Sequence, residues 1–236
     1  MNSNSLIKEI LNKSSLSKED LSVLENFEPN DGQNRLYSFF TPIWLCEVMY
    51  KLAVKHGFNE AKGKVLEPSC GTGNFLAVLK KPENAVAFEL DKLNFEISKK
   101  RNPKVKHYNM YFEQAFLNEP RYTTLSKDTT WLTEYPFDLV IGNPPYGKYK
   151  NLYSSYFSSL KMKQTEMFFM LQSMKMLKKG GLLVFITSQN FMRNDKTYLH
   201  EKQKIAEFAD FVDAYRMPKV FKNTEVPTDI LIFRRK

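Results

Sequence analysis

Short apolar runs alternate with amphipathic segments along most of the chain. Beyond residue 64 the apolar runs predict seven strands, at 65–66, 85–90, 105–108, 137–142, 182–187, 211–215 and 229–233. Between them, apolar residues recur at helical spacing and predict helices near 75–79, 92–101, 165–178 and 198–208. Strands that alternate with helices favour a mostly parallel sheet covered on both faces. We therefore expect an α/β fold with a doubly wound, seven-stranded sheet.

The chain ahead of this pattern is expected to be helical. Residues 1–35 are predicted to form a helical extension, with a capping box over Ser17–Asp20 and a turn or linker at 28–34. Residues 36–236 then form the main domain. In its first helix Thr41 is expected to be the cap and Pro42 to occupy the first turn, where no amide donor is missed. Gly57 is expected to end that helix.

Charge narrows the range of partners. The 236 residues include 35 Lys and Arg against 26 Asp and Glu, a net charge of +9 and a pI near 9.3. This balance favours a polyanionic partner, although a protein can also simply be basic. The longest apolar run, at 182–186, is too short for a membrane span, and the N-terminus lacks an export signal. Two cysteines and three widely spaced histidines indicate a cytoplasmic protein without a metal site.

Two loops at expected strand ends are candidates for ligand binding. Gly71 and Gly73 follow the first strand, where they let the backbone approach a ligand, and the next helix offers free amides to an anion. The spacing is not the dinucleotide fingerprint, because no third glycine follows. Glu89 ends the second strand, where a carboxylate suits ribose hydroxyls. For the glycine loop alone the alternative is a simple tight turn, and for Glu89 alone it is a surface carboxylate.

A third loop combines an amide, two prolines and a phenol. Residues 137–142 form the fourth predicted strand, and Asn143-Pro144-Pro145-Tyr146 follow it directly. Each proline biases the preceding residue toward extended backbone and lacks an N–H donor, so the carbonyls of this segment are net acceptors. With the Asn143 side chain and the Tyr146 ring, the loop is suited to a planar substrate that carries an NH2 group.

These motifs together resemble a known family. The segment EPSCGTGNF, the strand that ends in Glu89 and NPPY resemble S-adenosylmethionine-dependent amino-methyltransferases that modify adenine N6 in DNA. Residues 39–52 resemble that family's cofactor-binding helix. Its place ahead of the glycine loop matches the class whose recognition domain follows the catalytic one. Residues 220–233 resemble the hairpin whose Phe, here Phe221, faces the flipped base.

The resemblance implies a Rossmann-like class I methyltransferase fold with S-adenosylmethionine as methyl donor. The cofactor site that it implies consists of Thr41, Pro42, Glu67, Pro68, Cys70, Gly71, Gly73, Glu89, Leu90, Asn109 and Asn143. The implied catalytic group is Asn143, Pro144, Pro145 and Tyr146, with Tyr146 and Phe221 stacking on a flipped-out adenine. Asn109 departs from the family, which usually has Asp at the end of the third strand.

The segment that follows NPPY interleaves basic and aromatic residues. Lys148, Tyr149 and Lys150 are expected to contact nucleic acid, since lysines bind phosphates and aromatic rings stack on bases. A polar loop whose rings pack locally is the alternative. The predicted substrate is duplex DNA, and the sequence also allows structured RNA.

Two further classes stay open. A protein glutamine methyltransferase shares the amide-activation chemistry, but its usual glycine loop lacks the E-P-S-C beginning. A non-catalytic cofactor-binding subunit would often lose NPPY. The sequence stops after the last predicted strand without a recognition domain, so specificity is expected from loops, from a second copy in a homodimer, from a separate specificity subunit or from a part of the protein beyond this sequence.

Overall fold

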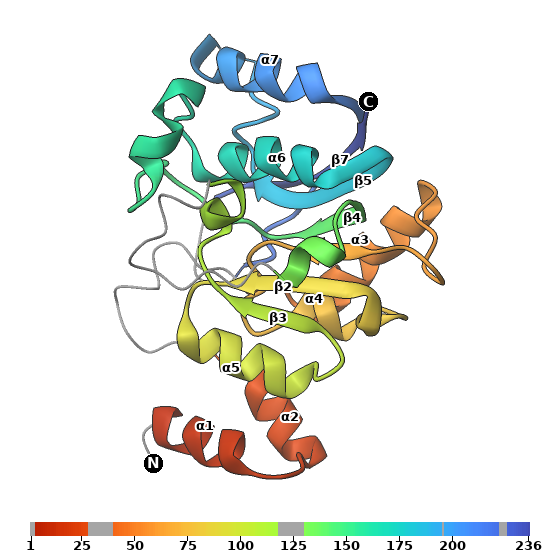
Figure 1. Cartoon of the computed structure of the whole chain (residues 1–236), viewed down its shortest axis with the longest axis vertical. Coiled ribbons are helices and arrows are strands. Elements are labelled where there is room, and N and C mark those ends of the chain that lie inside the picture. Colours follow the sequence, from red (N-terminus) through yellow and green to blue (C-terminus); the bar gives the residue numbers. More distant parts are fainter. Residues whose placement is uncertain (1–2, 28–39, 118–129, 195, 222–225) are drawn as a thin grey trace.

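The computed structural model describes residues 3–27, 40–117, 130–194, 196–221 and 226–236, and seven strands in these ranges form one sheet (Figure 1). The strand order is β3-β2-β1-β4-β5-β7-β6, with β7 antiparallel to both of its neighbours and the other pairs parallel. The strands are β1 (Val65–Glu67), β2 (Ala85–Glu89), β3 (Lys106–Asn109), β4 (Phe137–Gly142), β5 (Leu177–Ser188), β6 (Ala209–Arg216) and β7 (Thr228–Arg235). The predicted seven-stranded, doubly wound α/β fold is confirmed.

Helices cover both faces of this sheet. The α-helices are α1 (Ser3–Asn12), α2 (Lys18–Glu25), α3 (Ile43–Lys55), α4 (Asn74–Ala77), α5 (Lys92–Arg101), α6 (Thr165–Met176) and α7 (Leu199–Phe208). Short 3-10 helices are η1 (Pro82–Asn84), η2 (Phe112–Phe116), η4 (Thr130–Thr133), η5 (Ser154–Leu160) and η6 (Lys196–Tyr198). Within the described ranges, no helix is long and apolar enough to span a membrane.

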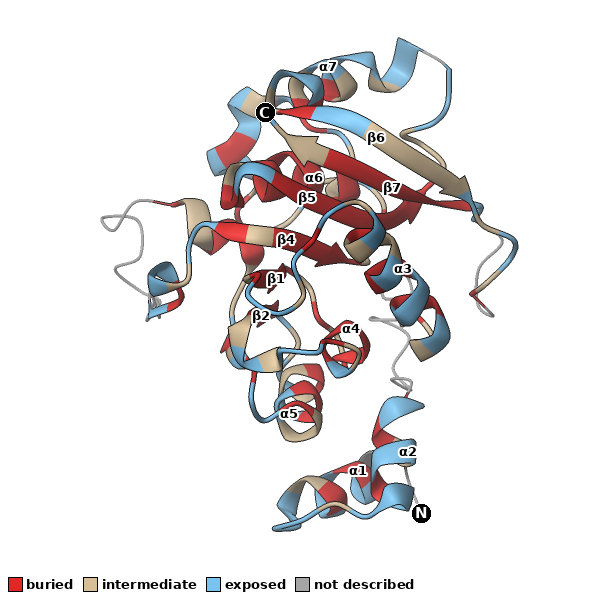
Figure 2. Cartoon of the chain, turned by 90° about the vertical axis from the view of Figure 1, so that its right-hand side faces the viewer, coloured by how far each residue is buried: buried red, intermediate tan, exposed pale blue. Residues whose placement is uncertain are grey.

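Alternate side chains of each strand enter two different cores. In β4, Leu139 and Ile141 join the core under α3 and α4, whereas Val140 joins the core under α6 and α7. All three are fully buried, as are β1 and most of β4 and β5 (Figure 2). Burial on both faces explains why these strands read as continuous apolar runs in the sequence.

The N-terminal helices pack against the outside of α5, at the end of the molecule away from α7 (Figure 1). The predicted capping box is present: the Asp20 amide donates to the Ser17 hydroxyl, and the Ser17 amide donates to the Asp20 carboxylate. Ile7, Ile10 and Leu24 form a small core with Ile97 of α5. The linker predicted at 28–34 lies outside the described residues. The division into an extension at 1–35 and a domain at 36–236 stays a prediction.

Three local predictions were wrong. Thr41 does not cap α3, because extended Pro42 (φ −59°, ψ 146°) is the cap residue and Thr41 stands one position earlier. Helix α4 ends at Ala77 after a single turn, short of the predicted residue 79. Strand β5 begins at Leu177, five residues before the predicted start, because the buried Leu177 pairs with Phe137 of β4 and α6 therefore ends at Met176.

Candidate active site

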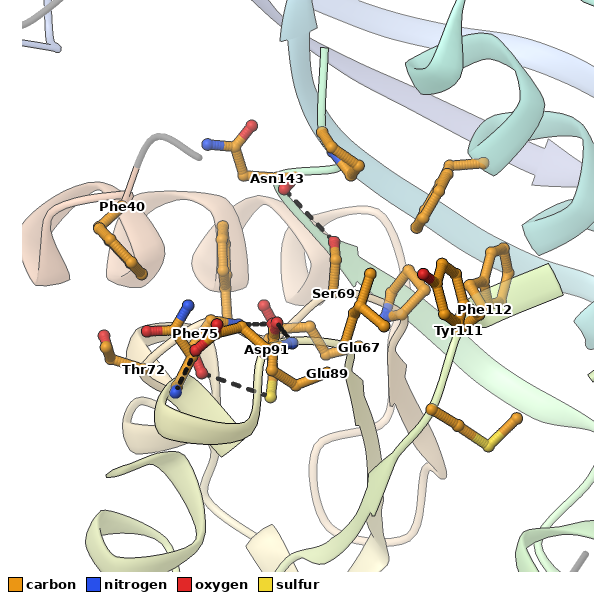
Figure 3. A pocket seen from close by; sticks show the side chains of 18 of the residues that line it. Phe40, Glu67, Ser69, Thr72, Phe75, Glu89, Asp91, Tyr111, Phe112 and Asn143 are labelled. Carbon is orange, nitrogen blue, oxygen red and sulfur yellow. Dashed lines mark hydrogen bonds between the residues drawn. The ribbon is translucent and has the colours of Figure 1, made fainter. Parts of the chain in front are cut away.

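A pocket of about 460 Å³ lies at the carboxyl ends of β1, β2, β3 and β4 (Figure 3). Each of these strands ends in a loop that lines the pocket, as expected at this edge of an open parallel sheet. Of the predicted cofactor and catalytic residues, the lining includes Thr41, Glu67, Pro68, Cys70, Gly71, Glu89, Leu90, Asn143 and Pro145. The pocket thus brings the glycine loop and the NPPY loop, which are far apart in the sequence, to one site.

The loop after β1 depends on two glycines with left-handed backbone. Gly71 has φ +53° and Gly73 has φ +85°, a region that other residues enter only with strain. Gly73 itself does not line the pocket. Its backbone lies against the Ser98 and Asn102 side chains of the α5 segment, so it fixes the loop from behind.

Glu89 joins the loops after β1 and β2. One carboxylate oxygen accepts a hydrogen bond from the Gly71 amide at 2.7 Å, and the other accepts from the Asp91 amide at 2.8 Å. Burial raises the pKa of Glu89 to about 7, and the two backbone hydrogen bonds only partly oppose this. Each oxygen keeps a lone pair, so the carboxylate can still accept from ligand hydroxyls.

Buried polar atoms along the pocket lack a partner among the described residues. They are Oγ1 of Thr41, Oγ1 of Thr72, Oε2 of Glu67 and Oδ1 of Asn94. Burial, followed by the charge of Glu89, raises the pKa of Glu67 well above its usual value. Buried polar groups are normally hydrogen-bonded, so these atoms indicate a polar ligand. Two hydroxyls and a carboxyl beside a glycine loop fit the ribose and amino-acid parts of S-adenosylmethionine.

Arg101, which the sequence analysis missed, holds the wall of the pocket. Its guanidinium donates to the Thr72 carbonyl at 2.7 Å and to Asn74 Oδ1 at 2.6 Å. The Asn74 amide in turn donates to the Thr41 carbonyl at 2.9 Å. This chain of hydrogen bonds connects α5 to the glycine loop and to the start of α3. A basic residue at the end of a helix has no distinctive sequence signal for this role.

The NPPY loop leaves β4 at the rim of the pocket. The Ser69 hydroxyl donates to the Asn143 carbonyl at 3.4 Å, which couples this loop to the glycine loop. Asn143 and Pro145 line the pocket, whereas Pro144 and Tyr146 do not. Tyr146 is buried, and its hydroxyl donates to the Ile186 carbonyl at 3.4 Å; burial raises the pKa of this phenol. The base-stacking role of Tyr146 stays a prediction.

A buried carboxyl supports the exit of the NPPY loop. Glu166 of α6 accepts from the Ser188 hydroxyl at 2.6 Å, from the Asn190 amide at 3.2 Å and from the Gly147 backbone amide at 3.3 Å. Burial raises the pKa of Glu166. The residue after Tyr146 is therefore tied to the end of β5 through one side chain.

Three other predicted site residues lie outside the pocket lining. Pro42 precedes α3, and Phe221 is buried in the core under α3; residues 222–225 of the predicted hairpin lie outside the described residues. Asn109 donates its side-chain amide to the carbonyls of Glu89 and Leu90, at 2.8 and 3.0 Å. It thereby holds the loop that carries the cofactor candidates. The predicted contacts of these residues with ligand stay predictions.

The residues predicted to contact nucleic acid lie in the loop that follows NPPY. Lys148 and Lys150 are exposed, as expected. The ring of Tyr149, however, stacks on Phe168 with 4.2 Å between ring centroids and 13° between planes, so one of its faces is covered. The nucleic-acid role of these three residues stays a prediction.

A buried carboxyl that the sequence analysis missed lies beyond β3. Glu113 is 2% exposed, lines the pocket and accepts a hydrogen bond from the Asn151 side chain. Burial raises the pKa of Glu113. Tyr111, Phe112 and Phe169 line the same part of the pocket and give it flat apolar walls. Residues 110–113 follow a strand end, which is a sequence signal for a pocket residue, but only Asn109 was predicted there.

The described side chains offer no group of three or more His, Cys, Asp or Glu that could hold a metal ion. The predicted absence of a metal site concerns the whole chain and stays a prediction.

Comparison with known proteins agrees with this geometry. The chain is 26% identical to the type II methyltransferase M.VspI of Vibrio sp. (strain 343) over 79% of its length and 45% of that protein. It spans about half or less of the curated relatives that it matches.

Two solved structures share the fold. One is the type I restriction-modification methyltransferase subunit from Streptococcus thermophilus, with a TM-score of 0.69 and 17% identity over 92% of this chain and 48% of that one. The other is a proposed class I S-adenosylmethionine-dependent methyltransferase of Listeria monocytogenes, with a TM-score of 0.66 and 17% identity over 98% of this chain and 78% of that one. The Eco57I restriction-modification methylase pattern matches residues 47–218, so the chain belongs to the Eco57I restriction-modification methylase family.

Proposed function

We propose that this chain transfers a methyl group from S-adenosylmethionine to the exocyclic N6 of an adenine that is flipped out of DNA. The observation that carries the proposal is the position of Asn143 and Pro145 in the lining of the pocket that also holds Gly71 and Glu89. A cofactor site and a cluster of hydrogen-bond acceptors therefore meet at one edge of the sheet.

The residues around the pocket suit this cofactor. In this proposal Glu89 accepts from ribose hydroxyls, and the buried hydroxyls of Thr41 and Thr72 with the carboxyl of Glu67 bind the polar amino-acid end. Tyr111, Phe112 and Phe169 offer apolar surface to its adenine ring. When bound, the cofactor supplies an electrophilic methyl group on a sulfonium.

The NPPY loop activates the amine through fixed acceptors. The lone pair of adenine N6 is delocalised into the ring, which makes N6 a poor nucleophile. If the Asn143 side-chain oxygen and the Pro144 carbonyl accept the two N6 hydrogens, the lone pair becomes available for attack. These acceptors stabilise the charge that develops on N6 in the transition state, without a general base. The Ser69 contact to Asn143 and the Glu166 contact to Gly147 keep the loop in place.

Three observations favour DNA as the substrate. The chain belongs to a restriction-modification methylase family, it carries a net charge of +9, and the loop after NPPY exposes lysines. A paired adenine cannot reach a pocket at the edge of the sheet, so the base is extruded.

Transfer of label from the methyl group of S-adenosylmethionine tests the proposal. Duplex DNA, single-stranded DNA, ribosomal RNA and total protein are offered in parallel. Asn143→Ala should bind the cofactor normally but lose about 100- to 1,000-fold in kcat, the usual effect of removing one fixed transition-state partner. Asn143→Asp keeps an acceptor oxygen and should recover part of this rate.

Several outcomes contradict the proposal. Transfer to RNA or protein but not to DNA excludes the DNA assignment. Cofactor binding without transfer to any substrate indicates a non-catalytic subunit. Turnover that persists in Asn143→Ala refutes the acceptor mechanism. Digestion of the labelled DNA to nucleosides identifies the modified base, and N6-methyladenine is expected.

A further inference from the structure

The loop between Gly147 and Gln164 is built as a rigid projection beside the pocket. Its two ends are joined by an antiparallel bridge, in which the Tyr149 amide donates to the Lys163 carbonyl at 2.9 Å and the Thr165 amide donates to the Gly147 carbonyl at 2.8 Å. Tyr153 and Phe157 anchor it to the core under α6. The surface of this loop is therefore held in a fixed position.

Leu152 stands at the tip of a turn in this loop. The Asn151 side-chain oxygen accepts from the Tyr153 amide at 3.0 Å, and the Asn151 carbonyl accepts from the Ser154 hydroxyl at 2.9 Å. Asn151 itself lines the pocket and is bonded to Glu113, so the turn is fixed to the pocket rim. Leu152 is 65% exposed, more than any other large apolar side chain among the described residues.

The loop that carries Leu152 is positively charged. Residues 147–165 contain Lys148, Lys150, Lys161 and Lys163 and no acidic residue. All four lysines are exposed, and Tyr156, 47% exposed, adds a ring. An apolar tip on a lysine-rich loop complements a nucleic-acid duplex, which offers phosphates outside and stacked bases inside.

We propose that Leu152 is an apolar wedge that enters the base stack of bound DNA beside the extruded adenine, while the lysines of this loop hold the phosphates. This inference rests on the proposed function, since it concerns how the same pocket obtains its substrate. Apolar side chains inserted between base steps unstack them, and extrusion leaves a gap of about the size that a leucine fills. The rigid turn keeps the ordering cost of insertion low.

Binding to a duplex with a preformed gap tests the wedge without knowledge of the target sequence. Fluorescence anisotropy compares a labelled duplex with the same duplex carrying one abasic-site analogue, which leaves a gap in the base stack and is called the gapped duplex here. The wild-type chain should bind the gapped duplex about fivefold or more tightly, because unstacking no longer opposes insertion. Leu152→Ala should reduce that ratio below about twofold, mainly through weaker binding of the gapped duplex.

Two matched variants separate the wedge from other effects. Leu132→Ala removes a leucine of similar exposure (51%) from η4; this residue does not line the pocket, so the variant should keep the wild-type ratio. Lys150→Gln should weaken binding to both duplexes equally and lower the salt slope by about one. Urea unfolding of each variant checks that the fold is intact.

Equal affinity of the wild-type chain for both duplexes overturns the proposal, as does an unchanged ratio in Leu152→Ala or no binding to either duplex. Methyl transfer is measured separately. A wild-type chain that prefers gapped DNA through Leu152 but transfers no methyl group supports the wedge and refutes the proposed function. Methyl transfer without any gap preference supports the function and refutes the wedge.

Discussion

Replacement of Gly73 by alanine tests how the glycine loop is supported. A Cβ at this position would lie 2.4 Å from Asn102 Nδ2 and 2.5 Å from Ser98 Oγ, and the backbone has φ +85°. The Asn102 amide donates to the carbonyls of Gly73 and Ser98. The Ser98 hydroxyl lies 3.4 Å from the Cys70 sulfur and 2.9 Å from His107 Nε2. The methyl group would displace both side chains.

The magnitude follows from these contacts. Left-handed backbone at a non-glycine residue costs about 1–2 kcal/mol. The displaced side chains give up four hydrogen bonds at about 1 kcal/mol each, and relaxation recovers part of this. We expect Gly73→Ala to lower the free energy of unfolding by about 4 kcal/mol, which is a large part of the stability of a typical domain.

Gly180→Ala is the matched control. Gly180 has a similar φ of +79°, but no heavy atom lies within 4 Å of the position that its new methyl group would occupy, so only the backbone strain applies. Urea unfolding followed by circular dichroism should give a midpoint for Gly73→Ala about 1 M below that of Gly180→Ala, for a slope of about 3 kcal/mol per M. Equal midpoints for the two variants would refute the argument that Ser98 and Asn102 fill the space behind the loop.

Three further predictions concern charged groups near the site. The pKa of Glu89 is raised to about 7, so the folded chain holds the proton of this carboxyl more tightly than the unfolded chain does. The free energy of unfolding should therefore fall as the pH rises from about 4.5 to about 7. Glu89→Gln should flatten this pH dependence in urea titrations. Glu166→Ala should lower kcat of methyl transfer by about 10- to 100-fold through a misplaced Gly147, with cofactor affinity in calorimetry unchanged and partial recovery in Glu166→Gln. Arg101→Ala should cost about 3 kcal/mol in urea unfolding and weaken cofactor binding, because two charge-assisted bonds to the glycine loop are lost. A flat pH dependence in the wild type would contradict the prediction for Glu89. Reduced cofactor affinity in Glu166→Ala would contradict the second prediction, and an unaltered unfolding midpoint in Arg101→Ala would contradict the third.

The fold could be predicted because its strands are buried on both faces. A strand such as 137–142 reads as one apolar run, and its loop follows at a fixed place on the sheet edge. For this reason Asn143, Gly71 and Glu89 were expected together and line one pocket. The limits of helices were less predictable, since the end of α6 is set by the pairing of Leu177 with Phe137, which is a contact between distant segments.

The site residues that were missed act through tertiary contacts. Arg101 supports the glycine loop from the end of α5, where the local sequence has no special pattern, whereas Glu113 lies in the pocket lining shortly after the end of β3. Tyr146 was expected to offer a ring surface, and in the structure it is buried with its hydroxyl bonded to the Ile186 carbonyl of β5. Local spacing indicates where a loop leaves the sheet, whereas the direction of each side chain depends on what packs behind it.

The position of β7 between β5 and β6 sets an order on folding. β7 (228–235) is paired on both sides, and the strands beside it precede it in the sequence. During synthesis β5 therefore emerges with one long edge of unpaired backbone N–H and C=O groups exposed, and β6 has no native partner until β7 is made. Such an edge can pair with other chains, so the interval before residue 228 emerges is when the chain is most prone to aggregate. Chaperones that cover exposed strand edges would act most usefully in that interval.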